Sequence, residues 1–266
     1  MDISKTSLEE AQRRYLEFRD PNFLAYFFNQ SGSLNPQLFY SNVDDSLYFD
    51  LVSMQFCMHY MFDSEESALN LFSNISRRLK NGGIFLCTIP DANVIVKRFR
   101  EKGRWNKNLK NFVVDNKYYS MTIDELSFEK NRLFGLKYGF YLEEAVGSKK
   151  NISDNEPEIT YVPEYLIEFQ NLINLAGKFD LKLMKKESIN FVDYFEQNKI
   201  TYKFLFEKLG LKYNETNYSM EQDFWDIVHL YKIAVFKKER DYELSVMEKG
   251  FHELKMNHLF LDKKFN

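Results

Sequence analysis

The sequence is poor in the residues that hold metal ions and disulfides. Its 266 residues include two cysteines and four histidines, and no four of these have the spacing of a metal site. Cys57 and Cys87 both lie in apolar runs, so we expect them to be reduced core residues in a reducing compartment. We therefore expect no bound metal.

Long apolar runs and positive charge are also scarce. No apolar run approaches the ~18 residues of a membrane-spanning helix, and the first residues, MDISKTSLEE, lack the pattern of a signal peptide. The net charge of −3 gives no global basic signal for nucleic acid, so any contact with RNA has to come from a local patch. Hydrophobic residues make up 44% of the chain, which is enough for the core of one large or two small domains.

A strand–helix–strand unit is the clearest pattern that is present. Residues 48–56 are mostly apolar and predict a buried strand. The helix that follows is expected to end near Lys80, because its apolar residues recur at three-to-four spacing and Asn81-Gly82-Gly83 favours a left-handed helix end. Residues 84–90 predict a second buried strand. Such a βαβ unit predicts a parallel sheet.

Weaker patterns predict the remaining elements. Helices are expected at 7–19 and 91–102, and another is expected to begin at Pro163, because proline favours the first helical position. Residues 143–158 are polar and predict a surface loop, and 239–266 form a tail with helical spacing. Strands are expected at 23–28, 133–142, 181–186 and 231–238.

Polar and aromatic residues follow both strands of the βαβ unit. In α/β folds, ligands bind beyond the carboxyl ends of the strands. Residues 55–60 and 90–93 occupy those positions, and a Gln, a His and a Tyr at one strand end would suit a flat ligand such as a base. From spacing alone, His59 at a helix start and a half-buried Tyr60 without a ligand remain the simpler interpretation.

Residues 49–95 contain a strand that runs into Gln-Phe…His-Tyr-x-Phe, followed by Arg-Leu-x-x-Gly-Gly and Thr-x-Pro. This segment strongly resembles the central block of eukaryotic mRNA cap (guanine-N7) methyltransferases. Further segments match in the family's order at 133–142, 162–169 and 224–238, so the resemblance covers about residues 2–238. The order and the several multi-residue matches make this resemblance specific.

The resemblance implies the α/β fold of class I S-adenosylmethionine-dependent methyltransferases, with a Rossmann-like sheet. The domain would span 1–238, with a small cap-binding insertion at about 104–180, and the helical tail would follow at 239–266. The family's glycine-rich donor loop lies upstream of the position that Asp2 matches, so we expect the sheet to lack its first strands. Strand 48–55 would then be the open edge of a four-stranded half-sheet. We expect residues 1–46 to be poorly anchored and donor binding by this chain to be weak or absent.

The family transfers the methyl group of S-adenosylmethionine to N7 of the guanine in GpppN-RNA during mRNA capping. Because N7 carries a free lone pair, no general base and no catalytic side chain are expected, and proximity and orientation lower the barrier. The resemblance implies 5′-capped RNA and other capping enzymes as partners, and the nucleus as the location. Two alternatives stay open: a catalytically deficient, methyltransferase-like subunit that binds RNA or cap or stimulates another chain, and a small-molecule methyltransferase.

Four residues match the family's guanine pocket. Glu164 would accept hydrogen bonds from the guanine N1–H and exocyclic amine, and His59, Tyr60 and Tyr231 would line the pocket. Without the resemblance, Glu164 is better interpreted as a first-turn helix glutamate beside Pro163, stabilised by the helix dipole.

Donor-binding residues follow from the same match. Asp2 corresponds to the acidic residue that binds the ribose hydroxyls of the donor, and Gln55 would contact its methionine or adenosine part. The family's Asp near the adenine is missing, and Asn29 or Gln30 is expected to replace it as a hydrogen-bond partner.

A basic run at 97–111 is the one local patch that could meet RNA. It holds seven Lys or Arg residues against one acid, Glu101, with aromatic residues between them. We interpret it as a path for the triphosphate or the RNA backbone, with Lys102, Arg104 and Lys107 as contacts. A solvated helix face and loop is the alternative interpretation.

Overall fold

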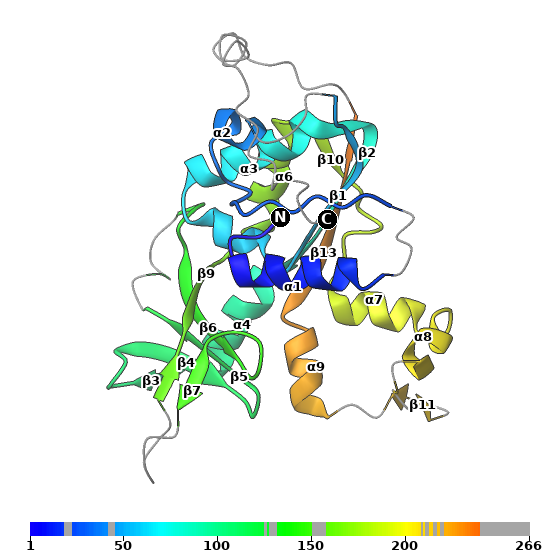
Figure 1. Ribbon diagram of the computed structural model, residues 1–266. Helices are drawn as coiled ribbons and strands as arrows, with labels where there is room; N and C mark the ends of the chain where they lie inside the picture. Colours follow the sequence, from blue (N-terminus) through cyan, green and yellow to red (C-terminus); the bar gives the residue numbers. More distant parts are fainter. Residues whose placement is uncertain are drawn as a thin grey trace.

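The computed structural model contains two main β-sheets with helices packed on them (Figure 1). It describes residues 1–18, 23–41, 46–124, 127, 132–150, 158–208, 210, 213–214, 217–218 and 221–239. The expected tail at 239–266 lies outside the described residues except for Glu239. Within the described part, no helix is long and apolar enough to cross a membrane, and no cluster of His, Cys, Asp and Glu could hold a metal ion.

The first sheet has the strand order β1-β2-β13-β10. Its strands are β1 (Phe49–Gln55), β2 (Leu79–Pro90), β13 (Tyr231–Lys238) and β10 (Leu181–Leu183). β1 and β2 are parallel, whereas β13 runs antiparallel to both β2 and β10. The βαβ unit and the four-stranded half-sheet expected from the sequence are therefore confirmed.

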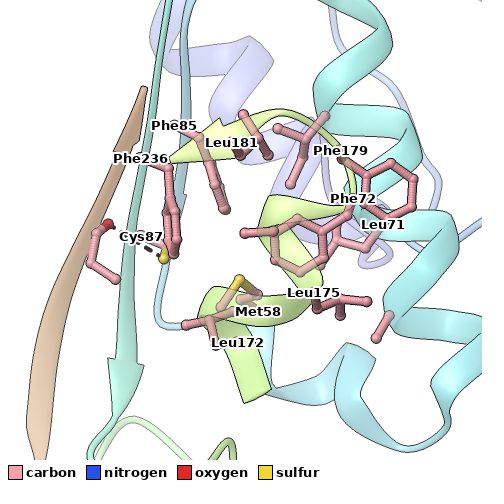
Figure 2. Close-up of a cluster of buried hydrophobic side chains, with 14 of the residues drawn as sticks. Met58, Leu71, Phe72, Phe85, Cys87, Leu172, Leu175, Phe179, Leu181 and Phe236 are labelled. Atoms are coloured by element: carbon pink, nitrogen blue, oxygen red, sulfur yellow. Dashed lines mark hydrogen bonds between the residues drawn. The ribbon is translucent and has the colours of Figure 1, made fainter. Parts of the chain in front are cut away.

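The core of the first sheet lies under two helices, α3 (Glu65–Arg78) and α6 (Phe169–Gly177). Figure 2 shows Phe72 of α3 and Leu172 of α6 packed over the sheet side chains. Phe85 of β2 and Phe236 of β13 stack with their ring centroids 5.8 Å apart. This core fixes the central strands at whose carboxyl ends the candidate site lies.

The second sheet is antiparallel throughout, with the order β3-β4-β5-β6-β9. One face packs on α4 (Ala92–Lys102), where Phe99 and Ile95 contact Phe140 and Met121 in a second buried cluster. The sheet lies below the first one in Figure 1, with α4 alongside it. Its strands are β3 (Arg104–Asn106), β4 (Asn111–Asp115), β5 (Tyr119–Ile123), β6 (Lys137–Leu142) and β9 (Val162–Tyr165).

Shorter elements complete the described chain. The helices are α1 (Lys5–Leu16), α2 (Pro36–Tyr40), α7 (Phe191–Asn198), α8 (Lys203–Lys208), α9 (Gln222–Val228) and the 3-10 helix η1 (Met58–Phe62). Two hairpins pair β7 (Ser148–Lys150) with β8 (Glu158–Thr160), and β11 (Tyr213–Asn214) with β12 (Asn217–Tyr218). The first hairpin replaces part of the surface loop expected at 143–158.

The expected helix start at Pro163 is wrong. Pro163 and Glu164 lie in β9, and α6 begins at Phe169 behind Glu168, whose carboxylate accepts hydrogen bonds from the backbone N–H groups of Gln170 and Asn171. Proline is tolerated here because β9 is the last strand of its sheet in the described part of the chain, and an edge strand needs fewer backbone donors.

The strand expected at 23–28 is also wrong. These residues form no regular strand, and a single parallel bridge joins Asp2 to Asn29. The aromatic residues pack on α1 instead, with the Phe23 and Phe27 rings 5.3 and 6.0 Å from the Tyr15 ring. Residues 1–46 are expected from the sequence to be poorly anchored, but residues 32–34 are held in place. The buried Asn74 amide donates to Gly32 O and Leu34 O at 2.8 Å each.

β1 is the outer strand of the first sheet within the described residues. The apolar sequence of this strand predicts that it is buried. Its side chains Phe49 and Leu51 are instead 38% and 54% exposed. In the described part of the chain, β2 is the one strand that pairs with β1. Unpaired edges with apolar side chains favour association with other chains.

The end of α3 differs from the glycine cap expected from Asn81-Gly82-Gly83. The helix stops at Arg78, and Gly82, with φ 81°, lies inside β2 where the register with β1 shifts. The buried Lys238 amine donates to Ser76 O at 2.6 Å and to Leu79 O at 2.9 Å. A lysine on β13 therefore satisfies carbonyls at the helix end.

Replacing Lys238 with methionine is expected to lower the free energy of unfolding by roughly 2 kcal/mol, because a buried carbonyl left without its donor costs ~1–3 kcal/mol. Lys237→Met is the matched control, since Lys237 is the exposed neighbour on the same strand. Urea denaturation of both variants measures the difference. Equal stability of the two variants would contradict the capping role.

Candidate active site

Glu164 lies at the centre of a buried cluster of polar side chains. It is 3% exposed, and β9 places it directly opposite Tyr138 of β6. The Tyr138 hydroxyl donates to one carboxylate oxygen, and the Tyr60 hydroxyl donates to the other at 3.1 Å. His59 Nε2 lies 3.3 Å from the same oxygen as Tyr60. The second sheet and η1 thus bring three polar side chains around one carboxylate.

The 3-10 helix η1 positions His59 and Tyr60. Met58 and Phe62, at its two ends, are fully buried in the core of the first sheet, and Phe62 O accepts a hydrogen bond from Gly135 N at 2.9 Å. Between these anchors, His59 and Tyr60 meet Glu164 of β9. A short helix fixed at both ends holds them with little freedom.

The hydroxyl groups of the site are held in their protonated form. Burial, and next the charge of Glu164, raise the pKa of the Tyr60, Tyr138 and Tyr231 phenols. Because an exposed tyrosine ionises only near pH ~10, these hydroxyls remain hydrogen-bond donors at any pH at which the protein works. The carboxylate therefore sits among donors.

His59 has hydrogen-bonding capacity left over. Its ring is 2% exposed, and neither ring nitrogen has a hydrogen bond of good geometry among the described residues. Buried polar groups are almost always paired in folded proteins, so a water molecule or a ligand is expected to complete the hydrogen bonding of this ring.

Tyr231 and Phe56 form an aromatic wall beside this cluster. Tyr231 begins β13 opposite Pro90, and its ring meets the Phe56 ring edge-on with the centroids 5.0 Å apart. Phe56 follows β1 with φ 56°, a left-handed conformation that is costly for a bulky residue and often marks a functional site. Phe56 and Tyr60 are 46% and 37% exposed, so they form the open side of a site whose floor is Glu164.

Two of these residues carry no signal of their role in the sequence. Tyr138 reaches Glu164 only through the pairing of β6 with β9. Phe56 was part of the matched motif, but its backbone conformation leaves no trace in the sequence. The four residues expected at the guanine pocket, His59, Tyr60, Glu164 and Tyr231, do lie together.

The residues expected to bind the donor lie at the carboxyl end of β1 and at the N-terminus. Gln55 ends β1, where its Oε1 accepts from the Thr88 hydroxyl and its Nε2 donates to Ser53 Oγ at 2.9 Å. Asn29 Nδ2 donates to Asp2 O and Ile3 O, both at 3.0 Å.

The exposed Asp2 carboxylate lies near the end of β1. The pKa of the Cys57 thiol is raised by burial and, to a smaller extent, by the charge of Asp2, which places that carboxylate close to the residue after Phe56. Gln30 follows Asn29 and is partly buried. Asp2 and Asn29 are neighbours, joined by the parallel bridge and by the Asn29 amide.

The basic run is less uniform than its sequence suggests. Arg98 is buried and turns inward, where its guanidinium donates to the Tyr119 hydroxyl at 2.6 Å and lies 3.6 Å from Asp226. Arg104 forms an ion pair with Asp115 on the neighbouring strand. Lys102 and Lys107 are exposed. Of the three residues expected to contact RNA, Arg104 is therefore partly neutralised.

Comparisons with known proteins show the family to which the chain belongs. The family model of the mRNA (guanine-N(7))-methyltransferase domain matches residues 1–239. The mRNA cap guanine-N(7) methyltransferase of Eremothecium gossypii is 32% identical over 91% of this chain and 55% of its own length. The mRNA cap guanine-N(7) methyltransferase 1 of rice, Oryza sativa subsp. japonica, is 30% identical over 90% of this chain and 62% of its own length.

The solved structures show the fold alone. The CcbJ methyltransferase from Streptomyces caelestis superposes with a TM-score of 0.51 at 8% identity, covering 88% of this chain and 76% of that one. The chain spans between 31% and 62% of the length of the curated relatives it matches. With the match across residues 1–239, the chain belongs to the mRNA (guanine-N(7))-methyltransferase family and has the α/β fold of class I S-adenosylmethionine-dependent methyltransferases.

Proposed function

We propose that the chain binds the guanine of a GpppN-RNA cap over Glu164 and holds it for methylation at N7. The observation that carries this proposal is the buried Glu164 carboxylate, which is surrounded by donors and lies beneath an open aromatic rim. Guanine presents N1–H and an exocyclic amine side by side, and a carboxylate accepts from both. Two tyrosine hydroxyls leave room for this, since a carboxylate offers about four acceptor positions.

The other residues of the site fit the remaining edges of guanine. His59, whose ring nitrogens have no hydrogen bond within the described structure, would donate to the guanine O6 next to N1–H. Tyr231 and Phe56 would cover the flat faces and edges of the base. The ligand would thus supply the partner that the buried imidazole lacks.

The transfer needs no proton to move. S-adenosylmethionine, when bound, supplies an electrophilic methyl group on a sulfonium sulfur. Transfer of that methyl group to the N7 lone pair would leave the S–C electron pair on sulfur and would pass positive charge to the guanine ring. With guanine bound as proposed, the buried Glu164 carboxylate would stabilise that charge, and holding the two reactants in line would contribute ~7–11 kcal/mol.

Asp2, Gln55, Asn29 and Gln30 are the residues that would hold the donor. The exposed Asp2 carboxylate suits the vicinal ribose hydroxyls, and Gln55 lies at the end of a parallel strand, where α/β folds bind their ligands. We propose the nucleus as the location and other capping enzymes as partners, because this is what the family implies.

A cap-binding subunit without donor binding is the second candidate function. It is favoured by the burial of the guanine-side residues Glu164 and His59, whereas the donor-side residues Asp2 and Asn29 are exposed. Calorimetry separates the two candidates. The enzyme binds both GpppG and S-adenosylhomocysteine, whereas the subunit binds GpppG alone. Equal affinity for GpppG and ApppA would contradict guanine recognition and therefore both candidates.

The basic run is expected to contribute to RNA affinity through its charge. Changing Lys102, Arg104 and Lys107 to Ala should weaken binding of a short capped RNA and reduce the slope of log affinity against log salt by up to about 2, since each single-stranded phosphate contact contributes ~0.7. The control changes Lys178, Lys185 and Lys186 to Ala, which removes the same charge from other exposed positions. If the slope of log affinity against log salt is the same in both triple variants, the basic run does not contact RNA and is a solvated helix face and loop.

A further inference from the structure

A hollow of about 420 Å³ lies next to the guanine site, between α4 and the ends of β6 and β9. One wall is a single face of α4, where Ala92, Val96 and Arg100 follow one another at four-residue spacing. Leu136 and Leu166 form the opposite wall. The hollow is large enough for one small organic group.

The hollow is a direct continuation of the Glu164 site along the second sheet. Glu164 and Tyr138 face each other in register, and two residues further along, Leu166 N donates to Leu136 O at 2.8 Å. Residues two apart on a strand lie on the same face and are separated by ~7 Å. A group joined to the bound guanosine through a phosphate bridge therefore reaches the hollow without leaving this face.

The charges around the hollow favour an anionic ligand. Glu168 is occupied as the N-cap of α6, and Glu101 lies 3.8 Å from Lys97. The exposed guanidinium of Arg100 has no carboxylate partner in the described part of the chain. An apolar floor beside an unpaired guanidinium suits a nucleoside that carries phosphate, because the ribose and base need apolar contact and arginine forms paired hydrogen bonds with phosphate.

We propose that this hollow binds the first transcribed nucleotide of the capped RNA. Its ribose and base lie against Ala92, Val96 and Leu166, and Arg100 contacts its phosphate. The inference rests on the proposed function, because it needs the cap guanine over Glu164. It assigns a role to Arg100, a residue outside the three basic contacts proposed above, and makes the chain a reader of the nucleotide after the cap.

The test compares GMP, which fills the guanine site alone, with GpppA, which adds the phosphate bridge and the second nucleoside. Fluorescence titration of the full chain is expected to show GpppA binding about tenfold more tightly than GMP, the value of roughly one charge-assisted hydrogen bond. Arg100→Ala should remove most of that difference and change GMP affinity by less than about twofold. Lys186→Ala is the matched control, since it removes an exposed positive charge away from the hollow.

A second variant narrows the hollow without changing its charge. Ala92→Leu, at the first position of α4, keeps a good helix former and should likewise reduce the preference for GpppA. A preference that survives in both variants, or no preference in the wild-type chain, would overturn the inference. If the inference about the hollow is overturned but Glu164→Gln still weakens the binding of both ligands, the proposed function stands. Failure of the wild-type chain to bind either ligand would overturn both.

Discussion

Replacing Glu164 with glutamine is expected to weaken GpppG binding at least about tenfold, because one paired contact to a base edge is worth ~1–3 kcal/mol. Glutamine keeps the size of the side chain, but its amide group presents a donor to the donors of guanine. The Tyr60 and Tyr138 hydroxyls can rotate to suit the new group, so the cluster keeps its shape.

The folding of the Glu164→Gln variant separates recognition from stability. A buried carboxylate is costly to desolvate, so the variant should unfold at the same temperature as the wild type or at a higher one. Glu158→Gln, at an exposed position of β8, is the matched control and should leave both affinity and stability unchanged. If folded Glu164→Gln protein binds GpppG with wild-type affinity, this carboxylate does not recognise guanine.

The second large effect is expected in the core that carries the site. Phe236 is fully buried between β2 and β10 and stacks on Phe85 (Figure 2). Phe236→Ala should lower the free energy of unfolding by ~3–5 kcal/mol, because the aromatic contacts are lost and a cavity remains. The thermal midpoint, followed by circular dichroism, should fall by about 10 °C.

Phe204→Ala is the matched control, since Phe204 on α8 is 62% exposed and its removal should change stability by less than ~0.5 kcal/mol. A Phe236→Ala variant as stable as this control would show that β13 is not packed as described. Because β13 also begins with Tyr231, the site should be lost together with the core on heating.

The sequence predicts those parts of the fold that depend on local patterns. The βαβ unit of β1, α3 and β2 follows from short apolar runs and helical spacing, and β13 follows from a run of apolar residues. Side-chain caps agree with these boundaries, as Ser64 accepts from Ser67 N at the start of α3 and Asp91 from Asn93 N at the start of α4.

Elements that depend on distant partners were predicted less well. Pro163 and Glu164 have the local signature of a helix start, yet pairing with β6 makes them a strand. The apolar aromatic residues at 23–28 suggest a strand, but in the described structure they pack on α1. Local propensity decides the structure only where no long-range contact opposes it.

In the candidate site, too, some residues can be predicted from local sequence and others depend on distant contacts. His59 and Tyr60 could be placed at the end of β1 by a general rule for α/β sheets, and Glu164 only through resemblance to the family. Tyr138 needed the register of the second sheet, and the inward turn of Arg98 needed the packing of α4 against it. Side chains that act across two sheets cannot be assigned from spacing along one chain.

A crystal structure of the chain with GpppG bound tests the central claim most directly. We expect the guanine N1 and N2 atoms within ~3.2 Å of the Glu164 carboxylate oxygens, with His59 facing O6 and Tyr231 beside the ring. N7 should point toward the end of β1 and Gln55. A guanine bound elsewhere, with Glu164 contacting Tyr60 and Tyr138 alone, would contradict the account.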